Sequence, residues 1–216
     1  MLLKYLYLFS LLSSALVATI YRKHLKSRLL TIFIPYLWLV TLQEFTLHVV
    51  LGFYPNLRTG IVYNLYRPIS AAFFGIFFYR VPFNAPVRKL IVWMWVANIA
   101  IILVNFLFIQ SIDQYNPFLS LANGIMITCW GIFFLVNYFH LDNFAEEKKW
   151  APIIWIIIGI MVYYPIVNIT LAFHKQLQAY DASLFNRKFY QAIPQLLSIV
   201  LYNCFTYTFY LCKKRS

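Results

Sequence analysis

Two pairs of polar residues stand out within neighbouring apolar stretches of this chain. Glu44 and His48 lie four residues apart in the first stretch, and Asn64 and Arg67 lie three residues apart in the next. Each pair would share one face of a helix, because neighbours on a helix surface are three or four residues apart. A charge surrounded by hydrocarbon is costly unless it is paired or hydrated. We therefore expect Glu44 to pair with Arg67, either within a ligand site or as a structural salt bridge.

The spacing of Glu44 and His48 also permits other chemistry. A carboxylate and an imidazole on one helix face could act as acid and base, or could supply two metal ligands. The sequence shows no third or fourth ligand beside them and no accompanying nucleophile. We therefore expect no metal site and no cofactor, and an enzyme is the less favoured class of protein.

Further polar side chains recur at a similar depth in the other apolar stretches, and prolines interrupt three of these stretches. The prolines are Pro68, Pro165 and Pro194. Each proline frees a backbone carbonyl and can kink a helix, so an outward-opening polar cavity is plausible. Asn, Gln and Tyr residues near helix ends also commonly form hydrogen bonds between helices, which is the alternative interpretation. The predicted ligand-binding set is Glu44, His48, Asn64, Arg67, Asn105, Asn123, Tyr164, Asn168 and Gln195.

Composition excludes a soluble globular domain. Of the 216 residues, 62% are hydrophobic, 20% are aromatic and only 11% are charged, which is typical of an integral membrane protein. The net charge of +12 does not indicate nucleic-acid binding, because the basic residues form short clusters between apolar runs. The three cysteines have no CxxC spacing and predict neither a disulfide framework nor a zinc site.

The apolar stretches predict an all-α membrane protein with one polytopic domain. A single crossing needs roughly 20 apolar residues. Although the first stretch has the outline of a signal peptide, we interpret it as an uncleaved helix because a basic cluster follows it directly. The predicted seven-transmembrane-helix bundle has helices at about residues 2–20, 29–51, 61–79, 90–110, 118–140, 151–172 and 191–212.

The distribution of basic residues predicts the orientation of these helices. Most of the 18 Lys and Arg residues lie on one side of the bundle, which the positive-inside rule assigns to the cytoplasm. The N-terminus is therefore predicted outside and the C-terminus inside. The basic residues that carry this prediction are Arg22, Lys23, Lys26, Arg28, Arg80, Arg88, Lys89, Lys148, Lys149, Lys213, Lys214 and Arg215.

Seven helices with an external N-terminus invite comparison with rhodopsins and G-protein-coupled receptors. The last apolar stretch has no lysine before Lys213, so it could not form a retinal Schiff base, and it lacks an NPxxY motif. The chain instead resembles uncharacterised small bacterial inner-membrane proteins associated with sensory systems. This resemblance rests on the topology and on an E…YNxYRP pattern, formed by Glu44, Tyr63, Asn64, Tyr66, Arg67 and Pro68. It implies a bacterial inner-membrane location and no established activity.

These observations favour a sensor or receptor-like module in the lipid bilayer. A small molecule or lipid would bind in the outer half, and a cytoplasmic or membrane partner protein would read the resulting change. A small-solute or proton-coupled transporter or channel is the main alternative, and it would need a polar path continuing into the inner half. A structural accessory subunit of a membrane complex is a further alternative.

Overall fold

In the computed structural model, each apolar stretch of the chain forms a long helix. Helices suit apolar surroundings because they satisfy their own backbone hydrogen bonds. The long helices are α1 (Leu2–Ile20), α3 (Phe33–Phe53), α4 (Gly60–Arg80), α5 (Ala85–Val104), α6 (Pro117–Phe139), α8 (Ile153–Ala172) and α10 (Phe189–Lys214). The structure describes residues 2–26, 29–54, 59–81, 83–109, 111–112, 116–140, 150–173, 176–177, 183–184 and 187–214.

Shorter elements connect or extend these helices. The four-residue helix α2 (Arg22–Leu25) and the 3-10 turn η2 (Leu30–Ile32) lie between α1 and α3. A π-helical segment, η3 (Asn105–Ile109), continues α5. Before α10, the strands β1 (Ser183–Leu184) and β2 (Arg187–Lys188) pair antiparallel. The sequence did not predict the π-helix or the strands, because segments this short carry little periodicity.

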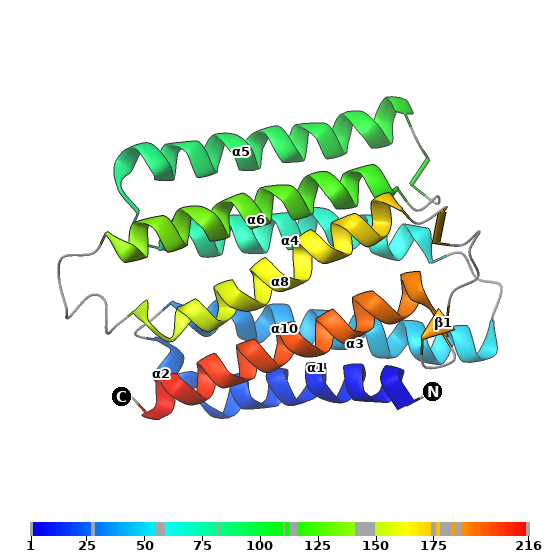
Figure 1. The fold of residues 1–216 in the computed structure, drawn as a ribbon, viewed down its shortest axis with the longest axis horizontal. Coiled ribbons are helices and arrows are strands. Elements are labelled where there is room, and N and C mark those ends of the chain that lie inside the picture. Colours follow the sequence, from blue (N-terminus) through cyan, green and yellow to red (C-terminus); the bar gives the residue numbers. More distant parts are fainter. Residues whose placement is uncertain are drawn as a thin grey trace.

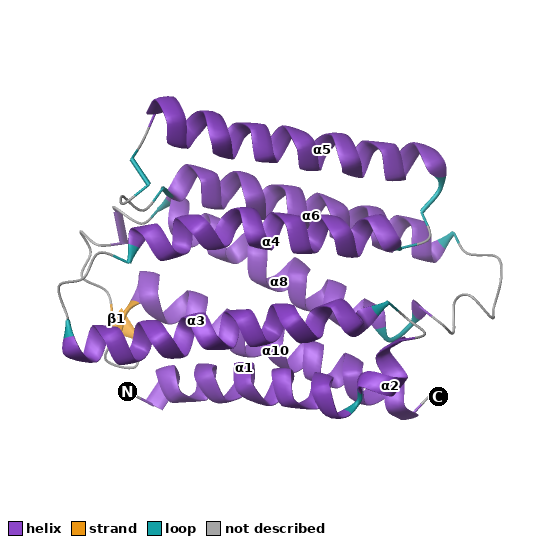
Figure 2. Ribbon diagram, turned by 180° about the vertical axis from the view of Figure 1, so that it is seen from behind, coloured by secondary structure: helices purple, strands orange, loops and turns teal. Residues whose placement is uncertain are grey.

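The long helices lie side by side in two layers (Figures 1 and 2). In Figure 1, α8 and α10 lie in front of α3 and α4, and Figure 2 shows the same layers from behind. Helix α1 forms one edge of the bundle, next to α3 and α10, and α5 forms the opposite edge, next to α4 and α6. The described ends of the chain lie at opposite ends of the bundle, so the N-terminal end and the C-terminal end are useful labels for its two halves.

Among the described residues, six helices are long and apolar enough to cross a membrane, so the chain is a multi-pass membrane protein. They correspond to α1, η2 with α3, α4, α5 with η3, α6 and α8. The predicted seventh span, residues 191–212, does form a helix, but α10 is not among the six. Its sequence contains Gln191, Gln195, Asn203 and several Thr and Tyr residues, which make it more polar than the others.

Helix α5 begins earlier than the sequence predicted. The Asn84 side chain accepts a hydrogen bond from the Val87 backbone N–H at 3.1 Å, and Pro86 occupies the first turn. An Asn cap followed by proline is a strong helix start, and this start outweighs the two basic residues that suggested a loop. The predicted final residue of this segment, Gln110, lies outside the described residues.

The C-terminal half of the bundle is filled by aromatic rings. The Phe33 side chain is completely buried, and its ring centroid lies 4.9 to 5.9 Å from four others. All four contacts are edge-on, the arrangement that aromatic quadrupoles favour. The four rings belong to Phe73, Phe77, Phe205 and Phe209. They join α3, α4 and α10, so this half of the bundle has a dense apolar interior.

Candidate functional site

Arg67 is buried inside the protein and is held by its own helix. Its guanidinium Nη1 donates a hydrogen bond of 2.7 Å to Asn64 Oδ1, and the Asn64 amide donates one of 2.6 Å to the Ile112 carbonyl oxygen. Only 4% of the Arg67 surface is exposed and none of the Asn64 surface. The spacing of three residues places both side chains on one helix face, as the sequence predicted. This chain of contacts ties α4 to the segment between α5 and α6.

Two further asparagine pairs join α5 to α6. Asn116 donates a 2.6 Å hydrogen bond to Asn105 Oδ1, and its own Oδ1 caps the first turn of α6 by accepting from the Leu119 N–H. Farther along, Asn98 donates to Asn123 Oδ1 at 3.2 Å. All four side chains are buried. Amide pairs of this kind are the usual polar contact between helices in a membrane.

The contact between α6 and α8 depends on Gly124. A methyl group added to Gly124 would lie 2.5 Å from Asn168 Oδ1, closer than two such atoms can approach. The glycine therefore leaves space for the buried Asn168 side chain.

We call Asn64, Arg67, Asn98, Asn105, Asn116, Asn123 and Asn168 the asparagine region.

Glu44 meets α1 and not Arg67, which corrects the predicted ion pair. The Tyr7 hydroxyl donates a hydrogen bond to the Glu44 carboxylate, and the Lys4 ammonium lies near enough to stabilise its charge. The prediction matched the depths of Glu44 and Arg67 along their helices, and depth does not fix the direction in which a side chain points. Helix α1 packs along α3, so its side chains reach Glu44.

His48 lies on the same side as Glu44, one turn farther along α3. Its imidazole meets the Tyr5 ring edge-on, with the ring centroids 6.2 Å apart. The buried Nδ1 atom has no hydrogen-bond partner among the described residues. Within the described part of the chain, no group of three or more His, Cys, Asp and Glu side chains could hold a metal ion.

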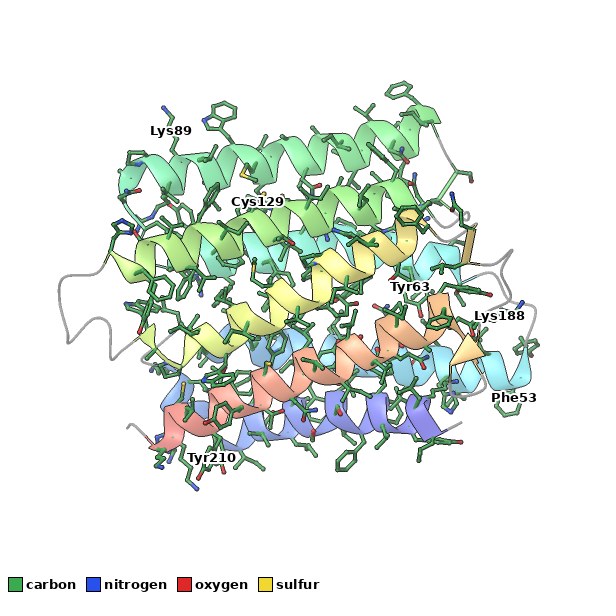
Figure 3. The ribbon with its side chains drawn as sticks, viewed as in Figure 1. Phe53, Tyr63, Lys89, Cys129, Lys188 and Tyr210 are labelled. Atoms are coloured by element: carbon green, nitrogen blue, oxygen red, sulfur yellow. The ribbon has the colours of Figure 1, made fainter. Side chains whose placement is uncertain are left out.

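Tyrosines from four helices gather on the side of α3 that carries Glu44. The Tyr7 and Tyr202 ring centroids lie 6.1 Å apart, and those of Tyr163 and Tyr164 lie 5.0 Å apart. Tyr202 is near enough to Glu44 and to Tyr163 for electrostatic interaction, and so is Tyr7. Tyr63 also acts on Tyr7, and Figure 3 shows it on α4 at the same end of the bundle as Lys188.

A second group of hydroxyls lies deeper in the bundle. The Tyr36 and Tyr66 hydroxyls form a hydrogen bond that joins α3 to α4. The Ser70 hydroxyl is hydrogen-bonded to both Tyr36 and Tyr164, which extends the contact to α8. We call Glu44 with Tyr7, Tyr36, Tyr63, Tyr66, Tyr163, Tyr164 and Tyr202 the tyrosine cluster.

Members of the tyrosine cluster differ in how completely they are buried. Tyr36 and Tyr202 are buried and belong to the same core as Phe33 and Phe209. Tyr7, Tyr66 and Tyr164 are half-buried and pack against this core. The cluster is therefore continuous with the aromatic core of the C-terminal half.

Seven of the nine predicted ligand-binding residues thus separate into two regions. Asn64, Arg67, Asn105, Asn123 and Asn168 belong to the asparagine region. Glu44 and Tyr164 belong to the tyrosine cluster. His48 lies at the seam between α1 and α3, and Gln195 is half-buried on α10.

Sequence reasoning missed Lys4, Tyr7, Tyr36, Ser70 and Asn116 as partners of these residues. Lys4 and Tyr7 carried a usable signal, because they are polar residues near the outer end of the first apolar stretch.

Comparisons with protein-family models, with curated proteins and with solved structures find no match to this chain.

Proposed function

We propose that this protein is a sensor or receptor-like module of a bacterial inner membrane. A small molecule or lipid binds in the tyrosine cluster, and a cytoplasmic partner protein reads the resulting change. In this proposal α10 crosses the membrane together with the six more apolar helices, because it packs along α1 and α8. The N-terminal end faces outward and the C-terminal end faces the cytoplasm.

The position of the exposed basic residues supports this orientation. Most exposed Lys and Arg side chains among the described residues occur where α1, α4 and α10 end and where α5 begins, at the C-terminal end of the bundle, and the exposed Lys188 lies at the opposite end. Cytoplasmic loops of membrane proteins carry this excess of positive charge. The exposed basic residues at this end are Arg22, Lys23, Lys26, Arg80, Arg88, Lys89, Lys213 and Lys214. Arg28, Lys148, Lys149 and Arg215, which the sequence prediction also used, lie outside the described residues.

The observation that carries the proposal is the contrast between the two halves. The tyrosine cluster combines a carboxylate, several hydroxyls and accessible surface within the N-terminal half. Beyond it, on the C-terminal side, stand the closely packed rings of Phe33, Phe77 and Phe209. A polar group that is closed by apolar packing on the C-terminal side suits binding better than passage. This arrangement favours a sensor over the transporter that the sequence left open.

The arrangement of the cluster also provides a way to transmit binding. Its side chains come from α1, α3, α4, α8 and α10, and three of these helices contain an internal proline. A ligand that contacts several helices stabilises the arrangement in which those contacts are best. At the opposite end, the Lys213 ammonium lies 4.9 Å from the centroid of the Tyr21 ring, so α10 and α1 also meet near the basic residues. A shift of α10 relative to α1 would therefore change the contacts between these helices at the C-terminal end.

The test is thermal stability of the purified protein with and without a library of metabolites and lipids. We expect at least one compound to raise the unfolding temperature of the wild type. Glu44→Gln should keep the fold and lose that shift. Arg67→Gln should lower stability but keep the shift, since Arg67 belongs to the asparagine region.

If no compound shifts any variant, the sensor proposal is wrong and an accessory structural role becomes the better hypothesis. If a compound binds and is also carried across vesicles containing the protein, the transporter alternative replaces the sensor.

A further inference from the structure

We propose that the basic residues where α1, α2 and α10 meet bind the headgroup of an anionic phospholipid. Two segments that are far apart in the sequence come together at this corner of the C-terminal end of the bundle (Figure 1). Five basic side chains are exposed there, outside the tyrosine cluster, so this site is independent of the ligand proposed above. We call them the basic cluster, and they are Arg22, Lys23, Lys26, Lys213 and Lys214.

Packing holds the backbone of the basic cluster in place. Leu25 on α2 and Cys212 on α10 are completely buried in the core of the bundle, and the basic residues beside them are exposed. The Lys213 ammonium lies 4.9 Å from the centroid of the Tyr21 ring, a cation–π contact that joins the end of α10 to the start of α2. The cluster is therefore assembled before an anion arrives, which reduces the entropy lost on binding.

The charge of the basic cluster has no counter-ion among the described side chains. Glu44 is the only acidic residue in the described part of the chain. It lies roughly 16 Å along α3 from Phe33, by the helical rise of about 1.5 Å per residue. Like charges that are held together repel one another, so a bound anion relieves this repulsion.

Exposed apolar side chains border the basic cluster and favour a lipid as the anion. Ile20 at the end of α1 is 71% exposed, and Tyr210 on α10 is 47% exposed. Figure 3 shows Tyr210 at the end of the bundle where α10 finishes. In a membrane protein such residues face acyl chains or the headgroup level. A phospholipid can place its acyl chains along these helices and its phosphate at the basic residues, as basic sites between membrane helices do.

A second basic group lies at the same end of the bundle, where α4 ends and α5 begins. It consists of the exposed residues Arg80, Arg88 and Lys89. The Arg88 guanidinium already contacts its own surroundings, since it lies 5.7 Å from the centroid of the Tyr79 ring and donates a 3.5 Å hydrogen bond to the Phe83 carbonyl oxygen. This group has fewer charges than the basic cluster, so we expect weaker lipid binding there.

Native mass spectrometry of the purified protein in a neutral detergent measures lipid binding directly. The probes are dioleoyl phosphatidylglycerol, which is anionic, and dioleoyl phosphatidylcholine, which has the same acyl chains and no net charge. We expect phosphatidylglycerol to bind at least about tenfold more tightly at low salt, because several basic side chains act on one anionic headgroup. The preference should decrease as salt is added. Equal binding of the two lipids at low salt would overturn the proposal.

A triple variant connects the preference to the basic cluster. Lys23→Gln, Lys26→Gln and Lys214→Gln together should weaken phosphatidylglycerol binding at least about tenfold and leave phosphatidylcholine binding unchanged. This variant keeps Lys213 and its contact with Tyr21. Unchanged phosphatidylglycerol binding in the triple variant would contradict the proposed site.

The matched control removes the same number of charges from the second basic group. Arg80→Gln, Arg88→Gln and Lys89→Gln together should weaken phosphatidylglycerol binding by about twofold or less, as expected for charges outside the site. Equal losses in the two triple variants would mean that the total charge attracts the lipid, and the basic cluster would not be a specific site.

Competition distinguishes a phospholipid from other anions. Glycerol phosphate carries a similar charge without acyl chains, and at equal concentration it should not displace phosphatidylglycerol. If it does, the basic cluster binds a soluble anion and the lipid proposal is wrong. Tighter binding of poly-glutamate than of phosphatidylglycerol would assign the cluster to an acidic protein partner and would also overturn the proposal.

Discussion

The two polar regions of this bundle differ in how completely their side chains are buried. In the asparagine region, short amide contacts such as Asn105 with Asn116 satisfy polar groups that are almost completely buried. In the tyrosine cluster, Tyr7, Tyr66 and Tyr164 are only half-buried, although their hydroxyls are hydrogen-bonded to Glu44, Tyr36 and Ser70. Fully buried amide pairs hold helices together, whereas a carboxylate and hydroxyls on half-buried side chains can exchange their partners for a ligand.

A buried charge inside a membrane protein therefore does not by itself mark a binding site. Arg67 and Glu44 are equally unexpected in the sequence. Arg67 is enclosed and bonded to a neighbour on its own helix, and Glu44 shares its position with a group of aromatic hydroxyls. The surroundings of each charge, and not the charge alone, decide its role.

Removal of Asn64 should produce the largest loss of stability. Asn64→Leu deletes the hydrogen bond that Arg67 donates and the one that reaches Ile112. We expect the free energy of unfolding to fall by about 3 kcal/mol, because hydrogen bonds to buried charged groups are strong. Denaturant titration of the purified protein measures this change.

The matched control for this substitution is the double variant Asn64→Leu with Arg67→Met. It removes the charge together with its acceptor and should recover part of the lost stability. A double variant that is no more stable than Asn64→Leu would argue against the importance of this pair.

Gly124→Ala should have the second largest effect. The added methyl group collides with Asn168 Oδ1, and the side chain must move or α6 and α8 must separate. We expect a loss of about 2 kcal/mol, typical of an overpacked interior. Adding Asn168→Ala to Gly124→Ala should restore stability, because it removes the atoms in the collision. If the added substitution lowers stability further, the two residues are not in the contact described here.

Asn116→Ala should have a smaller effect. It removes the cap of α6 and the hydrogen bond to Asn105. Cap removal typically costs about 1 kcal/mol, and interhelical hydrogen bonds in membranes cost less than that on average. The expected loss is about 1 kcal/mol in the same denaturant titration. Asn116→Ser can still cap the helix but is too short to reach Asn105, so it should fall between the wild type and Asn116→Ala.

Some of these features could be predicted from the sequence. Long apolar runs determine helices strongly, and the helices formed at the predicted places. Pairs on one helix, such as Asn64 with Arg67, could also be predicted because helical spacing fixes them. The weakest of the predicted spans was α10, since polar residues on a helix that packs against others lower its hydropathy without exposing it to water.

Contacts between different helices could not be predicted in the same way. The pairing of Glu44 with Arg67 relied on equal depth, and the rotation of each helix then selected Tyr7 and Lys4 as neighbours. A single sequence contains no information on that rotation when apolar residues surround the helix. The close approach of Gly124 to Asn168 depends on how α6 and α8 pack, so no local sequence pattern predicts it either.

Glu44→Gln should have the smallest effect on stability and the largest effect on binding. Glutamine keeps an oxygen that accepts the hydrogen bond of Tyr7, and it loses only the charge that Lys4 stabilises. We therefore expect the free energy of unfolding to change by about 1 kcal/mol or less. Lys4→Met should change stability by a similar amount, because it breaks the same pair from the other side. The two variants should differ in ligand binding, where Glu44→Gln loses the stabilising shift and Lys4→Met keeps it. A large loss of stability in Glu44→Gln, comparable to that of Asn64→Leu, would place Glu44 with the structural residues and remove the distinction between the two regions.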